Sequence, residues 1–362
     1  MLTIKYQNLM HLPHAVYHLI MKSVLIMLFF SNAALVSADN ADSLFKTDEV
    51  VRMELRADFS EIQKDRIVTP EIHKGELTYY NPDGSPVKLS VLVSVRGNFR
   101  KNPVNCSFPP LFVDFRKSDV SNTLFQDQEK LKLVTPCQSD EDVIDEYVIY
   151  KLYNKVTDLS LQVRLVKILY FDTGTGQELF EKYSFFLEDK DHAAERNGLK
   201  EKDFFLTPFA LDKENFMKLS VFQYLIGNKD WFVTSRHNII LMQPSDSTLP
   251  PYAVPYDFDF SGFVDAPYTN PAQGPENPLI DRRVFKGLCY TEAEFREVFD
   301  FYRELRPVFK SIIRDQKLIS PASRRHILDY MSQFYGIINT RDLIKQEFLG
   351  HCETKKMYNI PE

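Results

Sequence analysis

The spacing of hydrophobic residues changes near residues 188–200, and this change constrains the fold more than any other feature of the sequence. Before Glu188 most apolar residues alternate with polar ones in short runs, which is typical of β-strands. After it, long stretches show the spacing of amphipathic helices. Strands followed by helices predict an α+β fold rather than alternating βαβ units. We therefore predict a β-rich part at 45–190 and a helical part, with the candidate loops, at 191–362.

The first part contains a clear hairpin signal. Glu76–Tyr80 and Val87–Arg96 have strand composition, and Asn81-Pro82-Asp83-Gly84 between them is typical of a turn. Val50–Arg56 also alternates. Further strands are predicted at Leu111–Phe115, Glu129–Val134, Leu161–Phe171, Glu181–Leu187, Ile239–Met242 and Tyr252–Phe260.

Four segments are predicted to be helical: Asp140–Val156, Lys213–Ile226, Thr291–Lys317 and Pro321–Phe348. The first begins with acidic residues, which favour a helix N-terminus. In that helix, Ile144, Tyr147, Val148 and Leu152 define one apolar face. Asp189–Lys202 is interpreted as a charged, exposed connection, and Pro267–Pro278 as a proline-rich loop.

The N-terminus resembles an export signal. Met21-Lys22 supplies a positive charge, residues 24–30 are apolar, and Val36-Ser37-Ala38 fits a cleavage site. We interpret residues 1–20 as a mis-assigned start and 21–38 as a signal peptide, with an uncleaved anchor as the alternative. No later segment has the roughly 18 consecutive apolar residues of a membrane span. This predicts an exported protein of the periplasm or cell envelope, without a stable membrane span after cleavage.

The chain has four cysteines, Cys106, Cys137, Cys289 and Cys352. An exported chain with an even number of cysteines permits disulfides, and four cysteines allow three pairings. Cys106 and Cys137 lie in the same half, which favours that pair, but four buried free thiols remain an alternative. The net charge of −6 and the absence of a Lys/Arg run argue against a sequence-independent nucleic-acid binder.

Two short stretches carry the strongest chemical signal: GNKDWFVTSRHN at 227–238 and PYDFDFSG at 255–262. Asp230 and Asn238 share the first stretch, and Asp257 follows about 20 residues later. An Asp, an Asn and a later Asp are the side chains that phosphoryl transfer uses to orient a hydroxyl and hold Mg²⁺. On a strand, Asp257 and Asp259 would share one face, which favours a metal or basic partner.

In this order, the motifs resemble those of the CotH-type spore-coat kinases, a divergent branch of the protein-kinase-like fold. The resemblance covers roughly residues 50–345. The matching segments are Val95-Arg96-Gly97-Asn98, Ser107–Phe115, Leu131–Val134 with the following helix, Phe185–Asp189, Asp230…Asn238 and Asp257-Phe258-Asp259.

The resemblance implies a bilobal kinase-like fold that uses ATP and Mg²⁺ (or Mn²⁺) to phosphorylate Ser/Thr of a protein or another hydroxyl acceptor. It implies Asp230 as the catalytic base and Asn238, Asp257 and Asp259 as metal ligands. It also implies nucleotide contacts from Arg96, Asn98, Lys132 and Glu188. Glu146 would either pair with Lys132 or occupy a solvated helix position.

The sequence departs from the family pattern in two places. Seven residues separate Asp230 from Asn238, where the family usually has about four, so either the loop carries an insertion or Asn238 is not a metal ligand. No glycine-rich phosphate loop is present either. These departures keep two alternatives open: a catalytically inactive kinase-like envelope binding or assembly protein, and a hydrolase with a metal-activated water.

Overall fold

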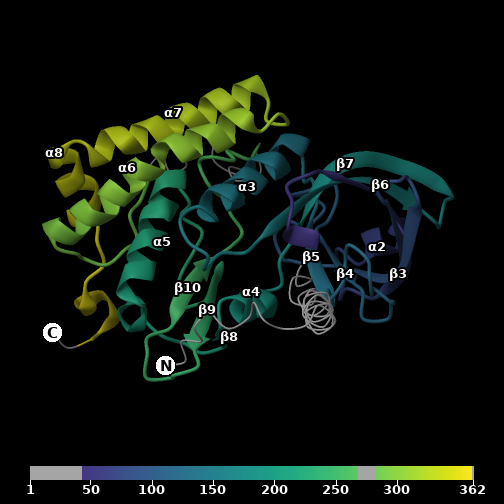
Figure 1. Cartoon of the computed structure of the whole chain (residues 1–362), viewed down its shortest axis with the longest axis horizontal. Helices are drawn as coiled ribbons and strands as arrows, with labels where there is room; N and C mark the ends of the chain where they lie inside the picture. Colours follow the sequence, from purple (N-terminus) through teal and green to yellow (C-terminus); the bar gives the residue numbers. More distant parts are fainter. Residues whose placement is uncertain (1–42, 268–282, 361–362) are drawn as a thin grey trace, which may run out of the picture. The chain divides into compact units, whose positions relative to one another are not determined.

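The computed structural model describes residues 43–267 and 283–360, and they form a mixed α+β fold (Figure 1). This confirms the predicted α+β class. The proposed mis-assigned start at 1–20, the signal peptide at 21–38 and most of the proline-rich loop lie outside the described residues.

Within the described residues, ten strands form two sheets, whose arrangement Figure 1 shows. The strands are β1 (Val51–Ala57), β2 (His73–Tyr80), β3 (Pro86–Val95), β4 (Leu111–Asp114), β5 (Lys130–Val134), β6 (Val163–Asp172), β7 (Gln177–Leu187), β8 (Leu199–Glu201), β9 (Ile239–Pro244) and β10 (Tyr252–Pro255). The first seven close into a barrel in the order β1-β2-β3-β4-β5-β7-β6, and the parallel pair β1–β6 closes it. The other three form a small antiparallel sheet in the order β10-β9-β8.

The helices are α2 (Phe59–Lys64), α3 (Asp140–Tyr153), α4 (Lys190–Arg196), α5 (Lys213–Ile226), α6 (Glu292–Asp315), α7 (Pro321–Ile338) and α8 (Arg341–Ile344). Short 3-10 turns occupy Ser43–Phe45, Pro208–Ala210 and Lys355–Tyr358, and a π-helical turn occupies Lys345–Leu349. In the described part of the chain, no helix is both long and apolar enough to cross a bilayer.

The barrel has its own hydrophobic core, formed by the inward side of each strand. Along β3, Leu89, Val91, Val93 and Val95 are buried while most residues between them are exposed or partly exposed, as the period of a strand requires. The predicted hairpin is confirmed, since β2 and β3 pair from Tyr80↔Pro86 onward.

A second core joins the helices to the start of β6, at Val163 and Leu165, and to the end of β7, at Phe185 and Leu187. Helix α3 belongs to this core and contacts β7, β6 and α6. The four residues predicted to define one apolar face of α3 are buried, but burial extends around the helix to all of Asp142–Tyr150, Leu152 and Tyr153. Because the barrel covers one side of this helix and other helices cover the opposite side, even the carboxylates of Asp142, Asp145 and Glu146 are buried.

Helix α5 was predicted within its observed bounds, and its two ends have clear caps. The Asp212 side chain accepts a hydrogen bond from the Asn215 N–H at the N-terminus. Gly227 ends the helix in the left-handed conformation, with φ of 70°. A Cβ at this position would also lie 2.1 Å from the Tyr330 hydroxyl, so the site requires glycine.

Two sequence interpretations are corrected by the structure. The predicted helix at Pro321–Phe348 breaks after Ile338, where Asn339 caps α7. The connection at Asp189–Lys202 is not simply exposed, because it forms α4 and β8 and buries Ala193 and Ala194. These two alanines lie between charged residues and form the buried side of α4. The high charge of the segment had led to the prediction that it is exposed.

All four cysteines form disulfides. Cys106 pairs with Cys137, which confirms the favoured pairing, and Cys289 pairs with Cys352. The first disulfide joins the loop after β3 to the segment between β5 and α3. These two segments flank Arg96 and Lys132, so the bond ties together the surroundings of two candidate residues.

Replacing both Cys106 and Cys137 by Ser should lower the free energy of unfolding by about 3 kcal/mol, because a bond across 31 residues restricts the unfolded chain. Urea unfolding of the oxidised protein measures this change. A loss below about 1 kcal/mol would mean that this bond contributes little to stability.

Candidate functional site

The loop after α5 holds Asp230 by hydrogen bonds on both carboxylate oxygens. His237 Nε2 lies 2.9 Å from Asp230 Oδ1, and Asn238 Nδ2 lies 3.2 Å from Oδ2. Asn238 Nδ2 also donates to the Asp230 carbonyl at 2.7 Å, and the Asp230 N–H donates to Asn228 Oδ1 at 2.9 Å. The Asp230 side chain remains 36% exposed, so another molecule can still reach its carboxylate.

The seven residues between Asp230 and Asn238 fold into a small hairpin. Phe232 and His237 form an antiparallel bridge with mutual backbone hydrogen bonds of 3.0 and 2.9 Å. Arg236 and Asn238 have φ angles of 52° and 55°, which reverse the chain and return it to β9. The seven residues therefore form a compact turn that leaves the Asn238 amide against Asp230.

The strand predicted at Tyr252–Phe260 stops at Pro255, and the expected common strand face of Asp257 and Asp259 is wrong. The partner strand β9 begins at Ile239, so residues beyond Pro255 have no ladder to continue. The Tyr256 N–H donates to the Asn238 carbonyl at 3.1 Å, which places this turn beside the Asp230 loop.

Asp257 itself has φ of 63°, an uncommon conformation for a residue other than glycine. Its N–H donates to Tyr150 Oη of α3 at 2.8 Å. This bond anchors the Asp257 turn to helix α3.

Two cations of the barrel face this turn. Arg96 follows β3 and Lys132 lies on β5, and the intervening β4 pairs with both strands. Lys132 Nζ lies 4.6 Å from the centre of the Tyr256 ring. Burial, and then the positive charge of Arg96, lower the pKa of Lys132 to about 8, while the charge of Asp257 opposes this shift.

Neither cation has an anionic partner at contact distance. Among the described residues, Arg96 and Lys132 form no ion pair and no side-chain hydrogen bond, and Arg96 Nε is buried without a partner. Buried donors are normally paired, and buried charges especially so. Arg96 Nε therefore has unused hydrogen-bonding capacity, and together with the charge of Lys132 it could bind an anion.

Glu146 is buried, with an exposed fraction of 2%, which corrects the expectation of a solvated position. Its partner is Arg100 rather than Lys132: Arg100 Nη1 lies 3.8 Å from Glu146 Oε2 and 3.9 Å from Asp259 Oδ2. Burial, and then the nearby charge of Asp257, raise the pKa of Glu146 to about 7. The Phe258 N–H also donates to Glu146 Oε1 at 3.4 Å.

Sequence analysis did not identify Arg100, although it lies only four residues after Arg96. Its guanidinium also donates to the Thr135 carbonyl, next to the Cys106–Cys137 disulfide. Asn98, predicted to contact the nucleotide, is exposed, and Gly97 beside it has φ of 75°. The signal that was available for Arg100 is a second arginine in a short turn that already carries Arg96.

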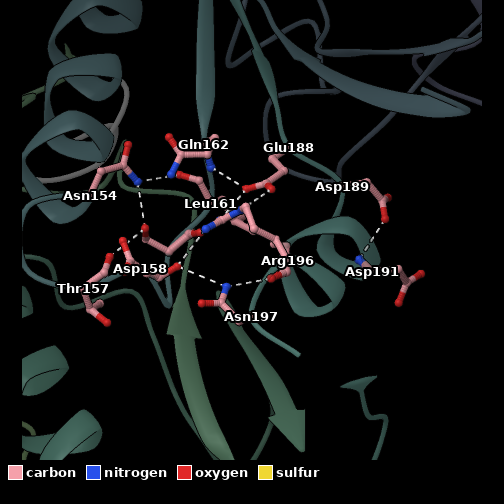
Figure 2. Close-up of polar contacts among 12 residues, drawn as sticks. Asn154, Thr157, Asp158, Leu161, Gln162, Glu188, Asp189, Asp191, Arg196 and Asn197 are labelled. Atoms are coloured by element: carbon pink, nitrogen blue, oxygen red, sulfur yellow. Dashed lines mark hydrogen bonds and ion pairs between the residues drawn. The ribbon is translucent and has the colours of Figure 1, made fainter. Parts of the chain in front are cut away.

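Glu188 belongs to a separate network, shown in Figure 2. Its side chain is 0% exposed, and Arg196 binds it with Nε–Oε1 and Nη2–Oε2 distances of 2.9 and 3.0 Å. Glu188 Oε2 also accepts the Gln162 N–H at 2.7 Å. Both carboxylate oxygens of Glu188 are thus engaged by neighbours.

The same network fixes the loop between α3 and β6. Arg196 also donates to the carbonyls of Asp158 and Ser160, at 3.2 and 2.8 Å, and Asn197 donates to the Asp158 carbonyl at 3.2 Å (Figure 2). Glu188 therefore holds α4 against this loop, whereas Arg96 and Asp257 interact electrostatically with each other and with both Lys132 and Glu146.

In residues 43–267 and 283–360, no three His, Cys, Asp or Glu side chains are grouped closely enough to hold a metal ion. The proposed metal ligands are two carboxylates and one amide, and Asp259 already faces Arg100. Such a set fits Mg²⁺ only in the manner of nucleotide sites, where waters and phosphate oxygens complete the coordination. Arg96 and Lys132 are the cations near Asp257 that could contact such oxygens.

The sequence matches no known family model and no curated protein.

Proposed function

We propose that this chain is an exported, kinase-like phosphotransferase that moves a phosphoryl group from ATP to Ser/Thr, or to another hydroxyl acceptor, with Mg²⁺. The observation that carries the proposal is the pair Arg96 and Lys132, two cations near Asp257 that form no ion pair at contact distance with any residue the structure describes. A polyphosphate would supply the missing acceptor oxygens there. The separate cores of the barrel and of the helices agree with a bilobal kinase-like arrangement.

In this proposal Asp230 orients the acceptor hydroxyl and accepts its proton. Its two oxygens are aligned by His237 and Asn238, and its partly exposed side chain leaves room for an acceptor. Asn238, Asp257 and Asp259 would hold the metal, which would neutralise charge on the phosphates when bound. Arg100 would keep Glu146 and Asp259 in place by facing both carboxylates.

The two disulfides agree with an exported protein, because such bonds persist in oxidising compartments. One observation favours the alternative of an inactive kinase-like binding or assembly protein. Within the described residues, no three acidic, histidine or cysteine side chains form a ready-made metal site. Nucleotide binding separates the two functions.

Adding Mg²⁺ and ATP should raise the melting temperature of the oxidised protein, because a ligand that binds only the native state stabilises it by mass action. Lys132→Met should lose most of the rise, since it removes a cation that would contact the phosphates. The rise should also shrink as the pH increases through about 8, where Lys132 loses its proton. Differential scanning fluorimetry measures each shift.

Lys130→Met is the matched control, because Lys130 lies two residues earlier on β5, is exposed and stacks on Phe112. It should keep the full rise in melting temperature. A protein that shows no rise with any nucleotide and metal would contradict the phosphotransferase and favour the binding or assembly role.

A further inference from the structure

A pocket of about 430 Å³ opens among α6, the end of α7, α8 and the π-helical turn Lys345–Leu349. None of these elements carries a candidate residue of the phosphotransferase site. The volume is in the range of pockets that bind small molecules. It is therefore a separate feature that the proposed function does not explain.

The floor of this pocket is apolar and firmly packed. Phe295, Phe299 and Ile338 are buried beneath it, and Ile344 and Leu349 are the partly exposed apolar side chains that line it. Phe348, on the π-helical turn, packs against Phe295 and Phe299 with ring centres 5.7 and 4.8 Å apart. The turn is thereby held in place, and such π-helical turns are frequent at functional sites.

The rim is strongly basic although the whole chain is acidic. Arg296, Arg303, Arg341 and Lys345 line the pocket, and Glu292 is the acidic residue among its lining residues. Clustering cations around an apolar floor costs free energy through mutual repulsion unless an anion offsets it.

Two of these cations already have partners. Arg303 is bound by Asp300, by Asn339 Oδ1 at 2.8 Å and by the Ile338 carbonyl at 2.5 Å. Arg341 lies 3.8 Å from Glu292. In the described part of the chain, Arg296 and Lys345 form no ion pair and no side-chain hydrogen bond, and both are exposed.

We propose that this pocket binds a small amphipathic anion: a carboxylate or phosphate ester joined to an apolar chain. The apolar part lies on the partly exposed side chains of Ile344 and Leu349, above the buried Phe295 and Phe299, and the anionic group lies between Arg296 and Lys345. The charge complementarity rests on the unpaired cations, and the apolar floor excludes a simple inorganic anion as the preferred ligand. Such an anion can be a free amphiphile or the end of an anionic lipid.

Isothermal titration calorimetry of the purified full chain, with disulfides intact, tests the proposal. Decyl phosphate and decanoate, kept below their micelle concentrations, should each bind one molecule per chain. Decanol and inorganic phosphate should bind at least about tenfold more weakly, because each offers only half of the recognised chemistry. Arg296→Glu and Lys345→Glu should each weaken decyl phosphate binding by about tenfold or more.

Arg314→Glu is the control, because Arg314 is an exposed cation of the same helix α6 outside the pocket. It should bind decyl phosphate as the wild type does. The two charge reversals are at exposed residues without ion pairs, so the variants should fold, and their circular dichroism spectra check this.

Sedimentation with phosphatidylglycerol vesicles separates the two sources of the anion. Sedimentation that Arg296→Glu abolishes identifies a lipid headgroup, and binding of the soluble amphiphiles without sedimentation identifies a free ligand. The proposal is overturned if the wild type binds neither amphiphiles nor vesicles, or if both charge reversals leave binding unchanged.

Discussion

Replacing Asp230 by Asn should slow phosphoryl transfer about 10²- to 10⁴-fold while changing nucleotide affinity little. The substitution preserves the shape of the side chain and its bond to Asn238 but removes the proton acceptor. Because Asp230 is proposed to act on the acceptor hydroxyl, the loss should fall on turnover rather than on ATP binding. Transfer of ³²P from γ-labelled ATP to the protein itself or to added protein acceptors measures it.

Asp246→Asn is the matched control, because Asp246 is an exposed carboxylate in the turn between β9 and β10. It should transfer phosphate at the wild-type rate. If Asp230→Asn were also as active as the wild type, Asp230 would not be the base and its contacts with His237 and Asn238 would be structural.

Replacing Arg196 by Met should destabilise the fold by about 3 to 5 kcal/mol, because it leaves the enclosed carboxylate of Glu188 without its counter-charge. It also removes the donors to the Asp158 and Ser160 carbonyls, which lie in the loop between α3 and β6. Urea unfolding followed by circular dichroism measures the loss. A double-mutant cycle with Glu188→Gln should recover part of it, since the uncharged amide no longer needs the guanidinium.

The control is Lys190→Met on the same helix α4. Lys190 lies 2.8 Å from Glu201, but its own side chain is 43% exposed, so the substitution should cost less than about 1 kcal/mol. Equal losses at Lys190 and Arg196 would show that the network of Figure 2 contributes no more than a surface pair.

Local patterns predicted much of the fold. The β2–β3 hairpin follows from alternation around Asn81-Pro82-Asp83-Gly84, and α5 follows from its helical spacing up to Gly227. Both depend on residues that are close in sequence, so their signals lie within one short window. Closure of the barrel by parallel pairing of β1 with β6 depends on residues 115 positions apart, such as Val51 and Val166, and no local pattern predicts it.

The candidate site shows the same limit. Asp230 and Asn238 were identified because they share one loop, and the structure places them in contact. The burial of Glu146 and its pairing with Arg100 could not be predicted, because a carboxylate in a helix is usually solvated and the enclosing core is built from distant segments. Glu188 was predicted as a nucleotide contact, while its binding by Arg196 depends on the fold of α4.

The most direct test of the central claim is a crystal structure of the protein grown with Mn²⁺ and a non-hydrolysable ATP analogue. The account predicts phosphate oxygens in contact with Arg96 and Lys132, and an anomalous peak for Mn²⁺ against the Asp257 carboxylate. Nucleotide bound elsewhere, or Arg96 and Lys132 without an anion at saturating analogue, would contradict it.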